Sequence, residues 1–207
     1  MGLERLIGEI LGQFRIPLQP EVLAGLIGFM EELDRWNRKI NLVGLKDIER
    51  ACRELLADAF FLHGYVAGRR RLVDAGSGSG ILAIPIALLN NDMTVYSVDS
   101  KLKKIQFQRH IRRLLGLRNL LPVHGRIETV GSLGADGFVA KAFGATKEIL
   151  TEAGRHLKEE GAVYVVKGRD EEGADSPGFE LIEDVPYKLP GVGKTYRLLI
   201  YKKVSQT

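Results

Sequence analysis

One short segment limits the possible folds of this chain more than any other: Asp74-Ala75-Gly76-Ser77-Gly78-Ser79-Gly80, directly after the apolar run Leu72-Val73. Glycines at alternate positions let the backbone turn tightly and approach a bound molecule closely. In open α/β sheets, ligands bind at such a segment between a strand and a helix. The amide groups at the start of the following helix suit a carboxylate or a phosphate. The segment therefore predicts an α/β fold with a ligand site beyond its first strand.

The residues after this segment alternate between strand and helix patterns, as a parallel sheet requires. The predicted strands are 71–74, 94–99, 120–123, 137–142 and 162–166, and the predicted helices are one ending near 89, 102–115 and 149–157. Two further strands, 179–188 and 195–204, flank Pro190-Gly191-Val192-Gly193 and predict an antiparallel hairpin. This pattern is similar to the class I methyltransferase fold, a Rossmann-like, mostly parallel, seven-stranded sheet closed by a C-terminal antiparallel hairpin.

The N-terminal third has a different pattern, with apolar residues at helical spacing over 3–14, 22–36 and 48–60. Asp47 is placed to cap the third helix. We therefore expect a helical N-terminal appendage over 1–66 and a ligand-binding domain over 67–207, packed as one unit. The apolar stripes could form a substrate platform, although core packing is the simpler interpretation of each residue.

Position 81 helps to identify the ligand. It is Ile81, where the dinucleotide fingerprint has a third glycine. The remaining spacing, with Gly76, Gly78 and Gly80, is typical of S-adenosylmethionine sites. Asp74 ends the first strand, where it could face the ammonium group of that ligand.

Polar residues at two neighbouring strand ends complete the predicted site. Asp99 ends the second strand, and a carboxylate there can accept hydrogen bonds from both ribose hydroxyls. NAD enzymes use the same device, and Asp99 could also simply cap the following helix. Ile127 and Glu128 follow the third strand, where Ile127 could lie against adenine and Glu128 could accept from its amino group. The alternative for Glu128 is a surface charge.

The reaction chemistry is limited by what the sequence lacks. Cys52 is the only cysteine, so a disulfide within the chain and a cysteine-based zinc site are excluded, and we expect no metal. Its place in the helical appendage favours a buried thiol over a nucleophile. The segment after the fourth strand, Ala140-Lys141-Ala142-Phe143-Gly144, lacks the Asn/Asp-Pro-Pro-Tyr/Phe pattern of amine methylation.

A ring nitrogen such as guanine N7 needs no general base, because positioning it in line with the methyl group can supply most of the catalysis. Positive groups for phosphate and a flat group for the base are then expected. Lys141, Arg126, Lys167 and Phe143 lie near strand ends and are candidates. The alternatives are solvated charges for the three cations and core packing for Phe143.

Positive charge is concentrated in one stretch of a chain whose net charge is +4. Between 101 and 126 there is no acid, and the basic residues are Lys101, Lys103, Lys104, Arg109, Arg112, Arg113, Arg118 and Arg126. Such an excess favours a polyanionic partner, although it could also be a solvated helix face.

Taken together, these residues resemble the RsmG (formerly GidB) family of bacterial small-subunit ribosomal RNA guanine-N7 methyltransferases. The likeness begins near residue 20 and is carried by Trp36-Asn37-Arg38-Lys39-Ile40-Asn41-Leu42-Val43, Asp74 to Gly80 with Ile84-Pro85, Val98-Asp99-Ser100 with Lys103-Lys104 and Phe107, Gly125-Arg126-Ile127-Glu128, Lys141-Ala142-Phe143 and Lys167-Gly168. Segment 53–59 departs from the family's Arg-His-x-x-Asp-Ser, Ser79 replaces a proline, and Lys141 replaces an arginine and so loses its bidentate fork.

The resemblance implies S-adenosyl-L-methionine as cofactor, with contacts at Gly76, Ile81, Ile127, Glu128 and Lys141. It also implies methyl transfer to N7 of one guanosine in the decoding-region loop, with ribosomal RNA or the small ribosomal subunit as partner. Three alternatives stay open: a methyltransferase of another RNA or a small molecule, an NAD-dependent oxidoreductase, and a non-catalytic RNA-binding factor that kept the fold.

The N-terminus, Met1-Gly2-Leu3-Glu4-Arg5, lacks the basic start and apolar run of a signal peptide. No stretch approaches the roughly 18 apolar residues of a membrane span. We expect a cytoplasmic monomer without a membrane partner.

Overall fold

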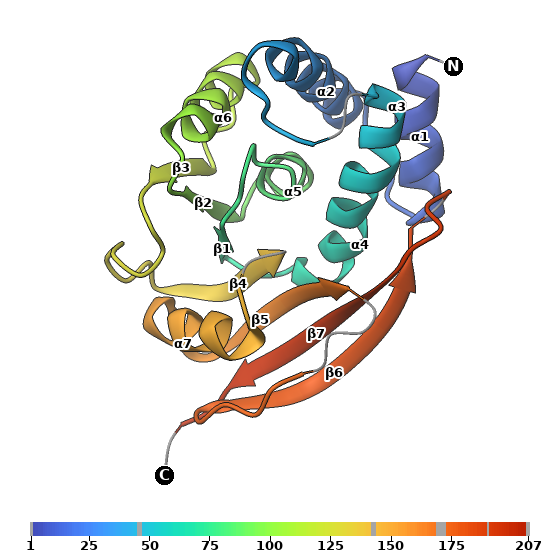
Figure 1. The fold of residues 1–207 in the computed structure, drawn as a ribbon. Helices are drawn as coiled ribbons and strands as arrows, with labels where there is room; N and C mark the ends of the chain where they lie inside the picture. The colour runs from blue at the N-terminus through green and yellow to red at the C-terminus, as the bar shows by residue number, and fades with distance from the viewer. Residues whose placement is uncertain (1, 45–46, 142–143, 169–172, 190, 206–207) are drawn as a thin grey trace.

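The computed structural model describes residues 2–44, 47–141, 144–168, 173–189 and 191–205. Its helices are α1 Leu3–Gln13, α2 Pro20–Ile40, α3 Ile48–Ala51, a π-helical turn Cys52–Leu56, α4 Ala57–Val66, α5 Ala83–Leu89, α6 Leu102–Leu114 and α7 Thr146–His156. Its strands are β1 Arg71–Ala75, β2 Thr94–Asp99, β3 Leu120–His124, β4 Ala135–Lys141, β5 Leu157–Gly168, β6 Phe179–Lys188 and β7 Thr195–Lys203 (Figure 1).

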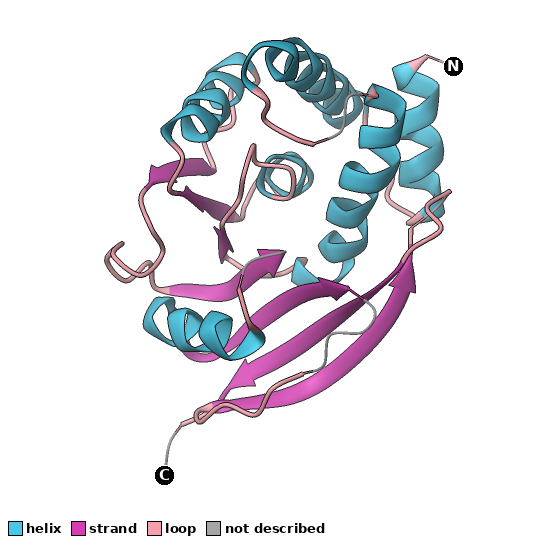
Figure 2. Ribbon diagram, viewed as in Figure 1, coloured by secondary structure: helices cyan, strands magenta, loops and turns pink. Residues whose placement is uncertain are grey.

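All seven of these strands form one sheet in the order β3-β2-β1-β4-β5-β7-β6. The first five in this order are parallel, and β7 is antiparallel to both β5 and β6 (Figure 2). The predicted class I methyltransferase fold with its C-terminal hairpin is therefore confirmed. In this register Asp99 pairs with His124, and Ala75 pairs with Val98, so the carboxyl ends of β1, β2 and β3 lie together.

Each face of the sheet has its own apolar core, because neighbouring strand residues point to opposite faces. Leu72 and Val95 belong to a core shared with α1, α2, α4, α5 and α6, whereas Val73 and Phe138 belong to a core closed by α7. In Figure 1, α7 lies apart from the group that α1, α2, α4, α5 and α6 form. The N-terminal helices thus share one core with the sheet. The boundary between 66 and 67 stays a prediction.

The sequence patterns misplaced several boundaries, above all the start of β5. The helix predicted over 149–157 ends at His156, and β5 starts at Leu157 rather than at 162. The first part of β5 contains the exposed residues Lys158 to Glu160, and Glu160 has a left-handed φ of 63°. Polar residues that extend beyond the core carry no strand periodicity, so the pattern showed only the buried half.

The third predicted helix also differs, since it is divided by the π-helical turn and extends to Val66. Its predicted cap is confirmed: Asp47 Oδ1 accepts the Arg50 amide at 2.7 Å. In the described parts of the chain, no helix combines the length and apolar character that crossing a membrane requires.

We expect Phe29→Ala to lower the free energy of unfolding of the whole protein by about 3–5 kcal/mol, because it removes a fully buried ring. Phe29 of α2 packs against Phe107 of α6, with ring centroids 6.2 Å apart. Urea unfolding followed by circular dichroism measures the change. Leu18→Ala, at a side chain that is 58% exposed, is the control and should change little. A Phe29→Ala protein that kept the main transition unchanged would show that the N-terminal helices unfold separately.

Candidate functional site

The glycine segment adopts a backbone that other residues rarely take. Gly76, Gly78 and Gly80 have φ values of 67°, 61° and 79°, all in the left-handed region where a Cβ is strained. At Gly80 an added Cβ would also lie 2.7 Å from Cδ1 of Ile84, in the first turn of α5. The segment therefore needs glycine both for its turns and for its contact with the helix.

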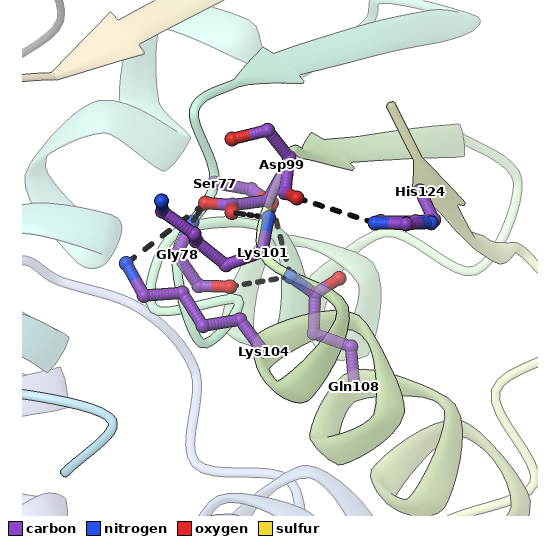
Figure 3. Close-up of polar contacts among 8 residues, drawn as sticks. Ser77, Gly78, Asp99, Lys101, Lys104, Gln108 and His124 are labelled. Carbon is purple, nitrogen blue, oxygen red and sulfur yellow. Dashed lines mark hydrogen bonds and ion pairs between the residues drawn. The ribbon is translucent and has the colours of Figure 1, made fainter. Parts of the chain in front are cut away.

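A buried glutamine of α6 holds the segment from below. Gln108 Nε2 donates to Ser77 Oγ at 3.0 Å and to the Gly78 carbonyl at 2.7 Å (Figure 3). The Ser77 amide in turn donates to the Val98 carbonyl of β2 at 3.0 Å. Sequence reasoning missed Gln108. Its signal is a polar residue on the buried stripe of α6, between Ile105 and Ile111.

Asp99, the last residue of β2, links this strand to the glycine segment and to the start of α6. Its Oδ2 accepts the Gly78 amide at 2.9 Å, and its Oδ1 accepts the Lys101 amide at 2.7 Å, just before α6 (Figure 3). The Lys104 ammonium lies 3.9 Å from Oδ2. The helix-side contact considered as an alternative is therefore present. Because a carboxylate has about four acceptor positions, it leaves acceptor capacity for ribose hydroxyls.

A cavity of about 240 Å³ opens beside Asp99, at the carboxyl ends of β2 and β3. Of the residues that the structure describes, those lining it are Gly76, Val98, Asp99, Ser100, Lys101, Lys104, Gly125, Arg126, Ile127 and Glu128. It thus brings together five residues predicted from sequence: Gly76, Asp99, Arg126, Ile127 and Glu128. A larger cavity of about 650 Å³, between α7 and 176–179, contains none of the predicted residues.

The walls of this cavity differ in exposure. Ile127 is buried, and its carbonyl lies 3.1 Å from Nε2 of the fully buried His156 at the end of α7. Arg126 and Glu128, on either side, are exposed. An apolar wall between two accessible charged residues suits a flat, polar-edged group such as a nucleobase.

Asp74 is buried near the cavity but does not line it. Mainly through burial, and with a smaller contribution from the nearby Asp99 charge, the pKa of its carboxyl rises to about 7, although a hydrogen bond from the Ala83 amide and the Lys141 charge oppose the rise. Its Oδ2 has no hydrogen-bond partner among the described residues. A buried carboxyl oxygen without a hydrogen-bond partner calls for a functional explanation. A cationic group of a ligand would supply one.

Lys141, at the end of β4, pairs with a residue that sequence reasoning missed. Its ammonium forms an ion pair with Asp58 of α4. The Tyr187 hydroxyl donates to the other Asp58 oxygen at 2.8 Å. Asp58 is only 2% exposed, so its charge is balanced by these contacts. The available signal was an acid among the apolar residues of α4.

A π-helical turn, Cys52–Leu56, falls within the segment that departs from the family pattern. Arg53 and Asp58 are five positions apart, one more than in Arg-His-x-x-Asp-Ser. A π-helical turn, here Cys52–Leu56, accommodates one additional residue in a helix.

Two further candidates, Lys167 and Ile81, do not line the cavity. Lys167 is 6% exposed, and its ammonium donates to the Gly144 carbonyl at 2.8 Å, beyond β4. Ile81 is partly buried and packs against the core under α5. Phe143 lies outside the described residues.

A cysteine nucleophile and a bound metal ion are two means of catalysis that other enzymes use. Cys52 is fully buried, and burial raises the pKa of its thiol to about 12. It therefore stays a thiol near neutral pH, which is a poor nucleophile. Within the described ranges, no group of three or more His, Cys, Asp and Glu side chains could hold a metal ion.

Comparisons with known proteins agree with this geometry. The family model GidB, rRNA small subunit methyltransferase G, matches residues 23–175. A "Ribosomal RNA small subunit methyltransferase G" of Geobacter sp. (strain M21) is 34% identical over 208 residues, which cover 95% of this chain and 96% of the relative. A protein of the same name from Shewanella amazonensis is 33% identical over 178 residues, covering 84% and 86%.

Solved structures show the same fold. A SAM-dependent methyltransferase from Aquifex aeolicus has a TM-score of 0.58 and 15% sequence identity, covering 86% of this chain and 98% of that one. The family model spans most of the chain, and the relatives match nearly their full length. The chain therefore belongs to the GidB family, the ribosomal RNA small subunit methyltransferases G.

Proposed function

We propose that this protein transfers a methyl group from S-adenosylmethionine to N7 of one guanosine in small-subunit ribosomal RNA. The observation that carries the proposal is the cavity between Asp99 and Ile127-Glu128, next to Gly76, in a chain of this family. A second support is that N7 carries a free lone pair and so requires no cysteine nucleophile, which agrees with the one cysteine being a buried thiol.

The residues around the cavity fit the methyl donor group by group. We propose that Asp99 accepts from its ribose hydroxyls and that Ile127 and Glu128 hold its adenine. The Asp74 oxygen that has no partner among the described residues fits its ammonium group. Gly76, Gly78, Gly80 and Ile81 shape the adjoining backbone. When bound, the donor supplies an electrophilic methyl group.

The cations near the strand ends would place the guanosine. Arg126 is exposed at the cavity and can hold a phosphate. Lys141, kept in place by Asp58, would contact the donor and the guanosine at the end of β4. We assign Lys167 a positioning role, because its ammonium is bound to the carbonyl of Gly144. Catalysis would then come from placing N7 in line with the methyl group.

We also propose that the protein works as a monomer in the cytoplasm, where an RNA-modifying enzyme meets its substrate. Light scattering across a concentration series would test the oligomeric state.

Asp99→Asn should weaken S-adenosylmethionine binding by about 10- to 100-fold, the usual loss for hydrogen bonds to a charged group. It replaces one acceptor oxygen with a donor that faces the Gly78 or Lys101 amide. Calorimetric titration measures the affinity. Asp92→Asn, an exposed residue just before β2, is the matched control. An unchanged affinity for Asp99→Asn would remove this residue from the proposed site.

Asp74→Asn should weaken donor binding by about tenfold and yet stabilise the free protein at alkaline pH. The unfolded carboxyl titrates near 3.8 and the folded one near 7. The native protein therefore binds the extra proton between these values, and its stability falls as pH rises through this window. The asparagine variant does not titrate. Its melting temperature should exceed that of the wild type by more at pH 8 than at pH 5, and a constant difference would contradict the assignment.

Ribosomal RNA from cells lacking this protein should lose one 7-methylguanosine from the small subunit. Mass spectrometry of nuclease fragments locates the change, and the purified protein with S-adenosylmethionine should restore it in vitro. Loss of a different methylated nucleoside, or no loss, would contradict the proposed reaction.

A further inference from the structure

Another recessed surface lies on α2, outside the proposed donor site. A groove of about 340 Å³ is lined by Arg35, Trp36, Lys39 and Ile40 near the end of this helix. Trp36 is the only tryptophan of the chain and is partly exposed, whereas Arg35 and Lys39 are exposed. Arg35 and Lys39 are four residues apart, so both lie on the side of the helix that carries the groove.

The indole of Trp36 is held in place from the inner side. Its ring lies 5.4 Å from that of Phe107, edge on, and 5.2 Å from the ring of His110, both on α6. His110 Nε2 lies 2.8 Å from Glu32, which also pairs with Arg35. The aromatic surface in the groove is therefore preorganised rather than mobile.

The end of α2 is fixed in a similar way. Asn37 Oδ1 accepts the Leu42 and Val43 amides at 2.6 and 2.9 Å, and Asn41 takes a left-handed φ of 46°. Lys103 of α6 donates to the Ile40 carbonyl at 2.9 Å. The two asparagines of the Trp-Asn signature thus have structural roles, which leaves the partly exposed Trp36 as the residue to explain.

Positive charge connects the groove to the donor cavity. Lys103 contacts the end of α2, and the next residue, Lys104, lines the cavity beside Asp99. Figure 1 shows α2 and α6 as neighbours on the same side of the molecule. The rest of α6 adds cations without an acid, among them the exposed Arg109, Arg112 and Arg113. A polyanionic chain can therefore follow one basic surface from the groove to the cavity.

We propose that the Trp36 groove binds an unpaired nucleotide of the RNA substrate, with its base stacked on the indole and a flanking phosphate held by Arg35 or Lys39. An aromatic face beside cations is the chemistry with which proteins hold single-stranded nucleic acid. An acidic peptide would satisfy the cations but would not use the flat indole surface. The proposal rests on the proposed function only in taking RNA as the substrate, because docking in the groove requires no methyl transfer.

The single tryptophan makes the proposal directly measurable. Titrating the full chain with an unlabelled single-stranded oligonucleotide from the small-subunit RNA should quench its fluorescence saturably. The midpoint should match the affinity from anisotropy of the same RNA carrying a label. A duplex of the same sequence and polyglutamate of equal charge should quench much less. Equal quenching by the duplex would overturn stacking, and equal quenching by polyglutamate would overturn the assignment to RNA.

Variants separate the groove from general attraction to RNA. Lys39→Glu should weaken RNA binding by about tenfold, whereas Lys147→Glu, an exposed lysine on α7, should leave it unchanged. Trp36→Leu should lower the RNA affinity, measured by anisotropy, by about tenfold. Trp36→Phe should keep most of the affinity because it keeps an aromatic face. RNA binding that is unchanged in both Lys39→Glu and Trp36→Leu would overturn the proposal.

The same samples distinguish this inference from the proposed reaction. Quenching without any methyl transfer to ribosomal RNA would leave the groove in place and remove the reaction. Full methyl transfer and wild-type RNA affinity in Lys39→Glu and Trp36→Leu would leave the reaction in place and remove the groove.

Discussion

The carboxylate of Asp99 is the contact on which the rest of the site depends. It joins the glycine segment, the end of β2 and the start of α6 through the amides of Gly78 and Lys101. Gln108 completes the link from α6 to the same segment. Because backbone amides have fixed directions, these bonds set the shape of the turn before any ligand arrives. The cavity beside Asp99 is a consequence of this fixed turn.

The helical N-terminal region contributes to the proposed site as well as to the core. Its α4 supplies Asp58, whose carboxylate holds Lys141 at the end of β4 and accepts from Tyr187 of β6. Its α2 packs on α6 and carries the Trp36 groove. Removing one partner of a buried ion pair is costly, so Asp58 ties the position of Lys141 to the correct packing of α4. The N-terminal helices thus share both a core and polar contacts with the sheet.

Several buried polar atoms around the glycine segment have no partner in the described parts of the chain. They include Asp74 Oδ2, Ser79 Oγ and Gln108 Oε1. Each such atom lowers stability, because its interaction with water is lost without replacement. Their concentration beside one turn agrees with a site whose polar groups are arranged for a ligand rather than for the stability of the free protein.

The sequence by itself determined the alternation of strands and helices, the glycine turn, and the placement of Gly76, Asp99 and Ile127 at one sheet edge. These features follow from local periods and from the rule that carboxyl ends of parallel strands meet. Only the tertiary structure decided that Gln108 supports the turn, that Asp58 meets Lys141 across 83 positions, and that Lys167 is buried against Gly144. The reason is physical: a residue's period along the chain fixes the face it occupies, whereas its partner on a distant element depends on how whole faces pack.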